Sequence, residues 1–281
     1  MEGITERSRT QWEDYNTTAV SSSKAQVSLK LPKEYWDLVV SFLLSKGFCK
    51  RDVANTILSM TDGKNNFVNF YASGILLIQG KEAERLKEEI LGLIKLEHVV
   101  VGCDEAGKGD VFGPLVLCCC ILRPENFEKV LSLSPKDSKK IKDEELLRKV
   151  QALENLVEFR CILLSPKELN QIYREKPNLN RILDWGYSEL IKEVLKKYPQ
   201  AKITVDAYSH RNPFGSLASF EHKAEEKVEV ACASMKARYE FLNWLKTYDL
   251  PKGASSEVMQ RARRMLNQKN YEDFVKAFFL K

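Results

Sequence analysis

Two adjacent carboxylic acids, Asp104 and Glu105, follow directly on the apolar run Val99–Val101. A run of this kind is typical of a buried strand, so both acids fall where a strand would meet the protein interior. Burying two neighbouring carboxylates is costly unless a cation or hydrogen-bond donors compensate them. Three glycines that permit tight turns or close approach of the backbone to a ligand come next: Gly107, Gly109 and Gly113. The combination predicts a divalent-metal site beside a phosphate-bearing substrate.

Further acids lie later in the chain where they could join the same site. Asp206 ends a second apolar run, Ile203–Val205, although a lone acid at a strand end also serves as a turn or cap residue. Four convergent carboxylates bind hard cations such as Mg²⁺ or Mn²⁺, and two such ions promote phosphodiester hydrolysis. The fourth carboxylate has several candidates ahead of the helix that is expected to start near Ala231: Glu221, Glu225, Glu226 and Glu229.

The elements before the acid pair predict a small α+β unit. Residues 1–24 are polar and are expected to be a flexible segment or a loosely docked arm. In residues 25–93, a strand is expected from Gln26 and a hairpin at Ser73-Gly74. Helical patterns occupy 33–47 and 81–96. We therefore expect two helices on a short antiparallel sheet.

Residues 94–281 alternate strand and helix patterns, which is typical of a layered α/β domain. Strands are expected at 98–105, 113–123, 157–165 and 201–209. Helices are expected at 143–153, 180–197, 255–267 and 270–280. Residues 228–248 show a strand-like start that runs into a long helix.

Length and composition favour a globular protein of two domains. The chain has 281 residues, which exceeds the usual size of one domain, and 44% of them are hydrophobic. No apolar run reaches the roughly 18 residues of a membrane span, and the N-terminus lacks an apolar signal segment. We therefore expect a cytoplasmic location and no membrane contact.

The seven cysteines show no zinc-ligand spacing, and three of them are consecutive in an apolar run, Cys118–Cys120. Buried free thiols in a reducing compartment are the favoured interpretation, and a disulfide or zinc framework is the alternative.

The charge is unevenly distributed. Residues 1–93 carry 12 basic and 12 acidic side chains, so the whole net charge of +5 lies in residues 94–281. A positive balance around an acid-rich site favours a polyanionic partner.

The stretch Gly102–Pro114 resembles the signature of type 2 ribonucleases H, and Asp110 and Phe112 make it most similar to the ribonuclease HIII branch. Four further segments agree with that family in order: 135–140, 204–206, 223–239 and 250–255. The resemblance extends over about residues 25–281. The sequence departs from the family pattern at residues 184–187.

The resemblance implies an endonuclease that hydrolyses the RNA strand of RNA–DNA hybrids to 5′-phosphate and 3′-hydroxyl ends with two Mg²⁺ or Mn²⁺ ions. It implies a ribonuclease H-like α/β domain over 94–281, with a central mixed sheet, flanking helices and C-terminal helices. A small α+β domain like the TATA-binding protein would precede it at 25–93. The implied catalytic and metal-binding acids are Asp104, Glu105, Asp206 and Glu225.

Substrate contacts are expected from the glycine-rich turn and from basic or polar residues near the acids. Glycines at 107 and 109 would let the backbone reach the ribose, whose 2′-hydroxyl distinguishes RNA from DNA. Cations position a nucleic-acid backbone without reading its sequence. A plain tight turn, a solvated basic turn and a structural ion pair of Arg238 are the alternatives. The expected substrate-binding residues are Gly107, Lys108, Gly109, Ser138, Lys139, Lys140, Arg238 and Lys252.

Two competing functions stay open from the sequence. A ribonuclease HII-like enzyme would nick DNA beside single ribonucleotides, and a non-catalytic protein would bind nucleic acid through its charged surface alone. The expected partner in the leading interpretation is an RNA–DNA hybrid duplex bound by a monomer.

Overall fold

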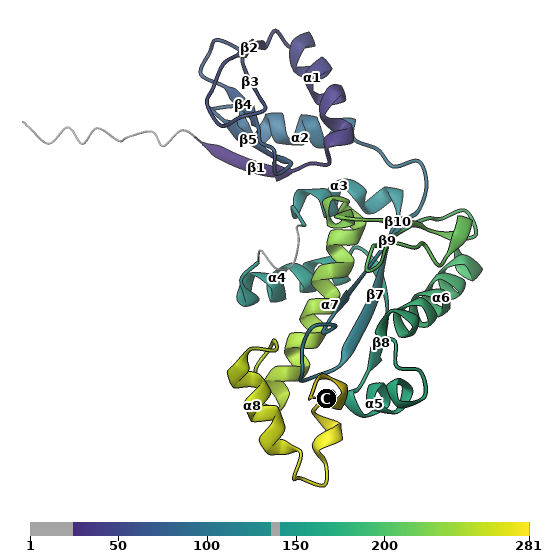
Figure 1. Ribbon diagram of the computed structural model, residues 1–281. Helices are drawn as coiled ribbons and strands as arrows, with labels where there is room; N and C mark the ends of the chain where they lie inside the picture. Colours follow the sequence, from purple (N-terminus) through teal and green to yellow (C-terminus); the bar gives the residue numbers. More distant parts are fainter. Residues whose placement is uncertain (1–24, 136–140, 281) are drawn as a thin grey trace, which may run out of the picture.

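The computed structural model describes residues 25–135 and 141–280, which form two five-stranded sheets with helices packed on each (Figure 1). The three predicted phosphate-binding residues Ser138, Lys139 and Lys140 lie outside the described residues.

The N-terminal sheet is antiparallel throughout, with strand order β1-β5-β4-β3-β2. Two helices pack on it and bury Val39, Leu43, Leu86 and Ile90. The expected α+β unit is thus present, with two further strands, β2 and β3, that no sequence pattern indicated. The elements are β1 Gln26–Lys30, α1 Trp36–Ser45, β2 Cys49–Arg51, β3 Leu58–Thr61, β4 Phe67–Phe70, β5 Ile75–Gln79 and α2 Ala83–Leu93.

The second sheet is mixed and has the order β10-β9-β6-β7-β8. Strand β6 pairs antiparallel with β7 and parallel with β9, so it lies at the centre. The layered α/β expectation is confirmed. The strands are β6 Val100–Ala106, β7 Leu115–Leu122, β8 Glu158–Leu164, β9 Lys202–Asp206 and β10 Ser219–Glu221. The helices are α3 Phe127–Ser132, α4 Asp143–Glu154, α5 Pro166–Glu175, α6 Leu179–Lys197, α7 Val228–Thr247 and α8 Ser256–Met265.

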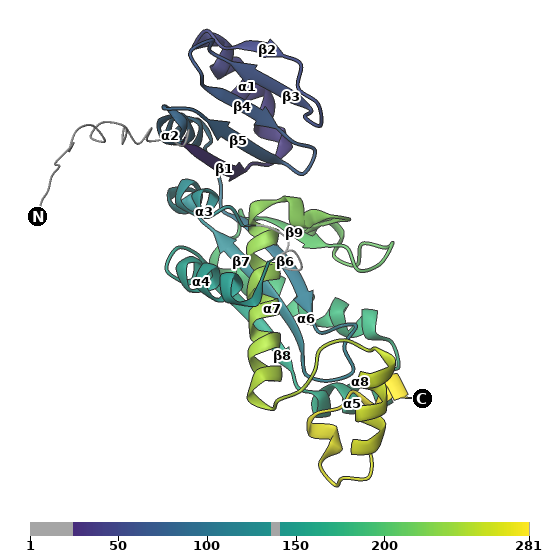
Figure 2. The same ribbon diagram turned by 90° about the vertical axis from the view of Figure 1, so that its left-hand side faces the viewer.

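Helices cover both faces of this sheet: α7 and α4 pack on one side, and α5 and α6 on the other (Figures 1 and 2). Strand β7 is buried along its whole length, as its near-continuous apolar run requires. Its side chains alternate between the layers. Leu117 and Cys119 pack with the α6 core, whereas Cys120 and Leu122 pack with residues of α7 such as Cys232.

Strand β6 and helix α7 approach so closely that one position tolerates only glycine. A Cβ atom at Gly102 would overlap the backbone of Glu229 and Val230 in the first turn of α7. This contact fixes α7 against the strand that carries the acid pair.

The two sheets share a hydrophobic core at their junction. Leu29 of β1 and Ile90 of α2 belong to the same buried cluster as Val130 and Leu131 of α3. The backbone amide of Lys30 also donates to the Ser134 hydroxyl at 3.3 Å.

No helix among the described residues is long and apolar enough to cross a membrane.

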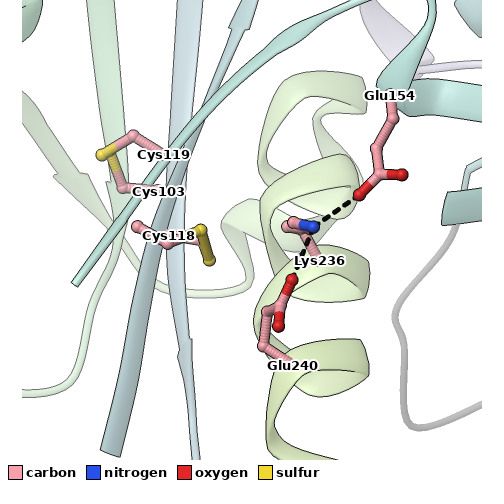
Figure 3. Close-up of a disulfide and its surroundings, with 7 residues drawn as sticks. Cys103, Cys118, Cys119, Glu154, Lys236 and Glu240 are labelled. Atoms are coloured by element: carbon pink, nitrogen blue, oxygen red, sulfur yellow. Dashed lines mark hydrogen bonds and ion pairs between the residues drawn. A yellow bond between two sulfur atoms is a disulfide. The ribbon is translucent and has the colours of Figure 1, made fainter. Parts of the chain in front are cut away.

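Four of the seven cysteines are paired, so the expectation of free thiols was wrong for them. Disulfides join Cys103 to Cys119 and Cys118 to Cys161 (Figure 3 shows the first). The physical reason is register, because each pair lies directly opposite across antiparallel strands. Cys120 and Cys232 are buried free thiols, as predicted, whereas Cys49 is a free thiol that is exposed.

Two helix predictions need correction. Residues 228–247 are helical from their first residue, because the apolar start of α7 packs against β6 instead of pairing as a strand. The stretch 270–280 forms two short 3₁₀ segments, Tyr271–Asp273 and Ala277–Leu280, around a bridge between Val275 and Phe112.

An ion-pair cluster joins helices α7 and α4. On α7, Lys236 pairs with Glu154 of α4 and, at 2.6 Å, with Glu240 of its own helix (Figure 3).

Candidate active site

Parallel pairing of β6 and β9 brings two predicted acids together. The register places Cys103 opposite Val205, so the next residues of the two strands, Asp104 and Asp206, end side by side. Their charges interact, as do those of Asp104 and Glu105. Since successive side chains alternate faces, Asp104 meets Ser234 of α7 while Glu105 meets Tyr187 of α6.

Asp104 is a buried acid whose pKa is strongly raised. Burial, then the negative charge of Glu105, raises the pKa of Asp104 to about 8, and Asp206 adds to the effect. Hydrogen bonds from Ser234 and from the Glu105 amide, the latter at 2.7 Å, oppose the rise in pKa. An ionised carboxylate that is buried beside other carboxylates is costly unless a cation compensates it, and carboxylate oxygens suit Mg²⁺ or Mn²⁺. The donor set therefore fits a divalent metal.

Asp206 is tied to the loop that carries the fourth predicted acid. Its Oδ1 accepts the backbone N–H of Ala224 at 2.9 Å, and Ala224 begins the short 3₁₀ turn Ala224–Glu226. The Glu225 side chain, however, lines a separate cavity of about 480 Å³ between the two sheets, together with Glu226. Among the described residues, no three acids, histidines or cysteines are close enough to form a ready-made metal site.

Glu105 is held by a second set of contacts. The hydroxyl of the fully buried Tyr187 donates to Glu105 Oε2 at 2.8 Å, and Lys108 Nζ lies 3.9 Å from Oε1. The Tyr187 ring stacks on Tyr208, whose hydroxyl donates to Asp184 at 2.6 Å. The Tyr208 carbonyl in turn accepts from Lys108 Nζ at 3.4 Å.

A cleft of about 550 Å³ opens beside the acids and is lined by the glycine-rich turn. Gly107 has φ of 86°, and a Cβ there would overlap the carbonyl oxygen of Pro114, so this glycine is required by the fold. Gly109 has nothing within 4 Å of a would-be Cβ, so the protein itself does not demand a glycine there. The structure brings together eight of the predicted site residues around this cleft: Asp104, Glu105, Gly107, Lys108, Gly109, Asp206, Arg238 and Lys252.

Arg238 also forms a structural ion pair, which is the alternative to a substrate contact. Its guanidinium donates to Asp143 of α4 at 2.8 Å. The Lys252-Gly253 pair precedes α8, whose first turn is capped by the Ser255 hydroxyl accepting from the amide of Val258 at 3.4 Å.

Three contributors to the site were not anticipated from the sequence. Tyr187 donates to Glu105, Ser234 forms a hydrogen bond with Asp104, and Lys276 Nζ donates to the backbone carbonyl of Asp110 at 2.8 Å. Only the helical spacing of Ser234 and Arg238 offered a signal, because partners on other elements leave no mark in a local pattern.

Comparison with known proteins identifies the family. The sequence model described as Ribonuclease HII matches residues 101–281. The Ribonuclease HIII of Aquifex aeolicus is 39% identical over 258 residues, covering 90% of this chain and 98% of that protein.

Solved structures agree with this assignment. A crystal structure of Aquifex aeolicus RNase H3 matches 90% of this chain and 100% of that chain with a TM-score of 0.60 and 39% identity. A structure of Bst-RNase HIII in complex with Mn²⁺ matches 91% of this chain and 96% of that chain with a TM-score of 0.62, at 22% identity, and so shares the fold. The chain therefore belongs to the ribonuclease HIII family, and it is a ribonuclease H enzyme.

Proposed function

We propose that this enzyme hydrolyses the RNA strand of RNA–DNA hybrids to 5′-phosphate and 3′-hydroxyl ends with the help of two Mg²⁺ or Mn²⁺ ions. The observation that carries the proposal is that Asp104, Glu105 and Asp206 all line the cleft that the glycine-rich turn also lines. When bound, divalent ions supply an activated water and neutralise the charge on the leaving oxygen.

The acids have distinct parts in the proposal. Asp104 and Asp206 lie side by side and would be the ligands that the two ions share. Glu105 would complete one ligand shell, and the Tyr187 hydroxyl holds its carboxylate in place. Glu225 would complete the other shell after a movement of its turn, and it directly follows Ala224, whose amide donates to Asp206.

Recognition of RNA is assigned to the turn Gly107–Gly109. Its backbone lines the cleft, and Gly109 leaves open space that a side chain would fill. Backbone N–H and C=O groups at this place can pair with a ribose 2′-hydroxyl, which both donates and accepts. A DNA strand lacks that hydroxyl and would leave the backbone groups unpaired.

The N-terminal domain is proposed to bind the duplex backbone. It carries basic side chains at Lys46, Lys50, Arg51 and Lys64, and Arg51 is braced 4.2 Å from the ring centre of Phe67. Cations of this kind contact phosphates regardless of sequence. We place the boundaries of the three segments at 1–24, 25–93 and 94–281.

Cleavage assays test the proposal directly. A hybrid with a run of ribonucleotides should be cut only when Mg²⁺ or Mn²⁺ is present, and the Asp104→Asn variant should bind it without cutting. A duplex with one embedded ribonucleotide separates the alternative, since the family model that matches 101–281 is that of ribonuclease HII. Equal cleavage of both duplexes would favour the HII-like activity, and metal-independent binding without products would favour the non-catalytic alternative.

A matched pair of variants tests the fourth acid. Glu225→Gln and Glu226→Gln change neighbouring residues that line the same cavity, so their effects on the fold should be alike. Only Glu225→Gln is expected to lower kcat, by about a hundredfold, because loss of a metal ligand should cost at least as much as the roughly 10–100-fold that loss of a ligand's hydrogen-bonding partner costs. A similar loss in both variants, or a loss in Glu226→Gln alone, would refute the assignment.

A further inference from the structure

The structure contains a lysine that is buried directly beneath the glycine-rich turn. Lys276 is 1% exposed, and its Nζ donates to the backbone carbonyls of Gly107, of Asp110 at 2.8 Å and of Phe112 at 3.5 Å. An ammonium group has three N–H donors, so its whole capacity is used on the carbonyls of one turn.

A lysine is a costly residue to bury at this place. Burial lowers the pKa of Lys276 to about 7, and the nearby charge of Asp110 only partly opposes this. Burying an ammonium group is unfavourable compared with packing an apolar side chain of the same length. The three hydrogen bonds offset this cost, and they also fix where the three carbonyls are held.

The backbone around Lys276 aims its side chain at the turn. Its own N–H donates to the Val111 carbonyl at 2.9 Å, and Gly113 N–H donates to the Phe274 carbonyl at 3.1 Å. The segment at 274–276 therefore runs alongside 111–113, and the Lys276 side chain reaches back under the part of the turn that lines the cleft.

A fixed carbonyl fixes its whole peptide group. Because a trans peptide is planar, its N–H points opposite to its C=O. With the Gly107 carbonyl turned towards Lys276, the N–H of Lys108 faces the other way, on the side where Gly107–Gly109 lines the cleft.

We infer that Lys276 is a positioning residue for RNA recognition: it holds the backbone of the glycine-rich turn in the orientation that reads the ribose. It does not touch the substrate, and it acts through the peptide groups of Gly107 to Asp110. The inference rests on the proposed function, because the turn is taken to contact an RNA strand.

Equilibrium binding to two duplexes of one sequence tests the inference. In an Asp104→Asn background, dissociation constants are measured for an RNA–DNA hybrid and for the matching DNA duplex. Lys276→Met keeps the apolar stem and removes the donors. It is expected to weaken hybrid binding about tenfold, as the loss of a buried hydrogen-bonding group implies, and to leave DNA binding within about twofold.

Asn170 offers a matched control for simple loosening of the same segment. Its buried side chain donates to the Val275 carbonyl and accepts from the Ala277 amide, both at 2.8 Å, on either side of Lys276. Asn170→Ala should lower the Tm at least as far as Lys276→Met does, yet it should keep the preference for the hybrid. If both variants lose that preference equally, or Lys276→Met keeps it, the inference is overturned.

Two further measurements keep the outcomes separate. Should Lys276→Met fail to fold, hydrogen exchange on the wild-type enzyme decides. The Asp110 amide donates to the same Gly107 carbonyl that Lys276 binds. Slow exchange of this amide without substrate supports a prearranged turn, and exchange as fast as in an exposed loop overturns the inference. Wild-type cleavage of the hybrid tests the proposed function separately. A chain that prefers the hybrid but never cuts it would refute that function and leave the role of Lys276 standing.

Discussion

Replacing Asp104 by Asn is expected to make the metal-free protein more stable. In the wild type, burial and the charge of Glu105 raise the pKa of Asp104 to about 8, so its ionised form is disfavoured in the folded state. Asn has nearly the same shape, carries no charge, and its side-chain oxygen can still accept the Glu105 amide at the position where Asp104 does. The substitution removes the electrostatic cost and keeps the hydrogen bond.

The magnitude and its pH window follow from linkage. A rise in pKa from 3.8 to about 8 means that the folded state binds the proton more tightly than the unfolded state does. The cost is therefore absent below pH 3.8, grows as pH rises, and levels off above pH 8, where it reaches at most about 6 kcal/mol. Because water entry and local relaxation reduce such costs, we expect Asp104→Asn to gain about 2–4 kcal/mol above pH 8.

Denaturant unfolding in EDTA at several pH values measures this gain. The advantage of Asp104→Asn should widen between pH 6 and pH 9 by at most about 3 kcal/mol. Adding Mn²⁺ should stabilise the wild type and have little effect on the variant, because only the wild type has the full ligand set. An advantage that stays constant with pH, or a destabilised variant, would refute the reasoning.

Asp62 provides a control, because its pKa is lowered where that of Asp104 is raised. Its slight burial raises its pKa, but hydrogen bonds from Asn66 and from the Lys64 amide outweigh this and lower the pKa overall. Its ionised form therefore stabilises the fold at neutral pH, and that stabilisation is lost as pH falls through the lowered pKa. Asp62→Asn is expected to lose stability under the conditions in which Asp104→Asn gains it.

Tyr187→Phe removes the hydrogen bond to Glu105 and should lower kcat about tenfold while KM for the hybrid changes little, as steady-state kinetics will show. Gly102→Ala should prevent folding, because its Cβ would overlap the backbone of α7. Gly92 lies in helix α2 with open space around it, so Gly92→Ala should raise the stability measured by thermal unfolding by about 0.5–1 kcal/mol. Removing residues 1–93 should raise KM for the hybrid more than it lowers kcat, and an unchanged KM with a reduced kcat would contradict the role given to the N-terminal domain.

Local patterns in the sequence were sufficient for most of the long elements, although the ten-residue helix α5 was not predicted. The acid-bearing strands, the buried run of β7 and helix α6 were all expected close to their observed bounds. Short elements such as β10 and α3 were missed, because three to six residues carry too little periodicity. The start of α7 resembled a strand in sequence because this part of the helix is buried on several sides. Its apolar residues therefore form a nearly continuous run and do not show the spacing of a helix with one buried face.

The acids of the site followed from sequence, but their supports did not. Asp104 and Asp206 could be expected to meet, since both end apolar strands. The hydroxyl of Tyr187 and the ammonium of Lys276 reach the site from elements 82 and 169 residues away from their partners. Such distances are set by tertiary packing, and a single sequence contains no local trace of them. The cross-strand disulfides depended in the same way on register.

Strands β6 and β9, which carry Asp104 and Asp206, pair across a long stretch of chain, with Val100 opposite Lys202. Enzymatic activity should therefore return late in refolding. Contacts between residues so distant along the chain form slowly, because a long loop must close before the contact gains any energy. A chain that has regained its helices but has not yet joined β6 to β9 would give a native-like helical signal and no cleavage. During refolding from denaturant, recovery of cleavage should therefore lag behind the return of far-ultraviolet circular dichroism.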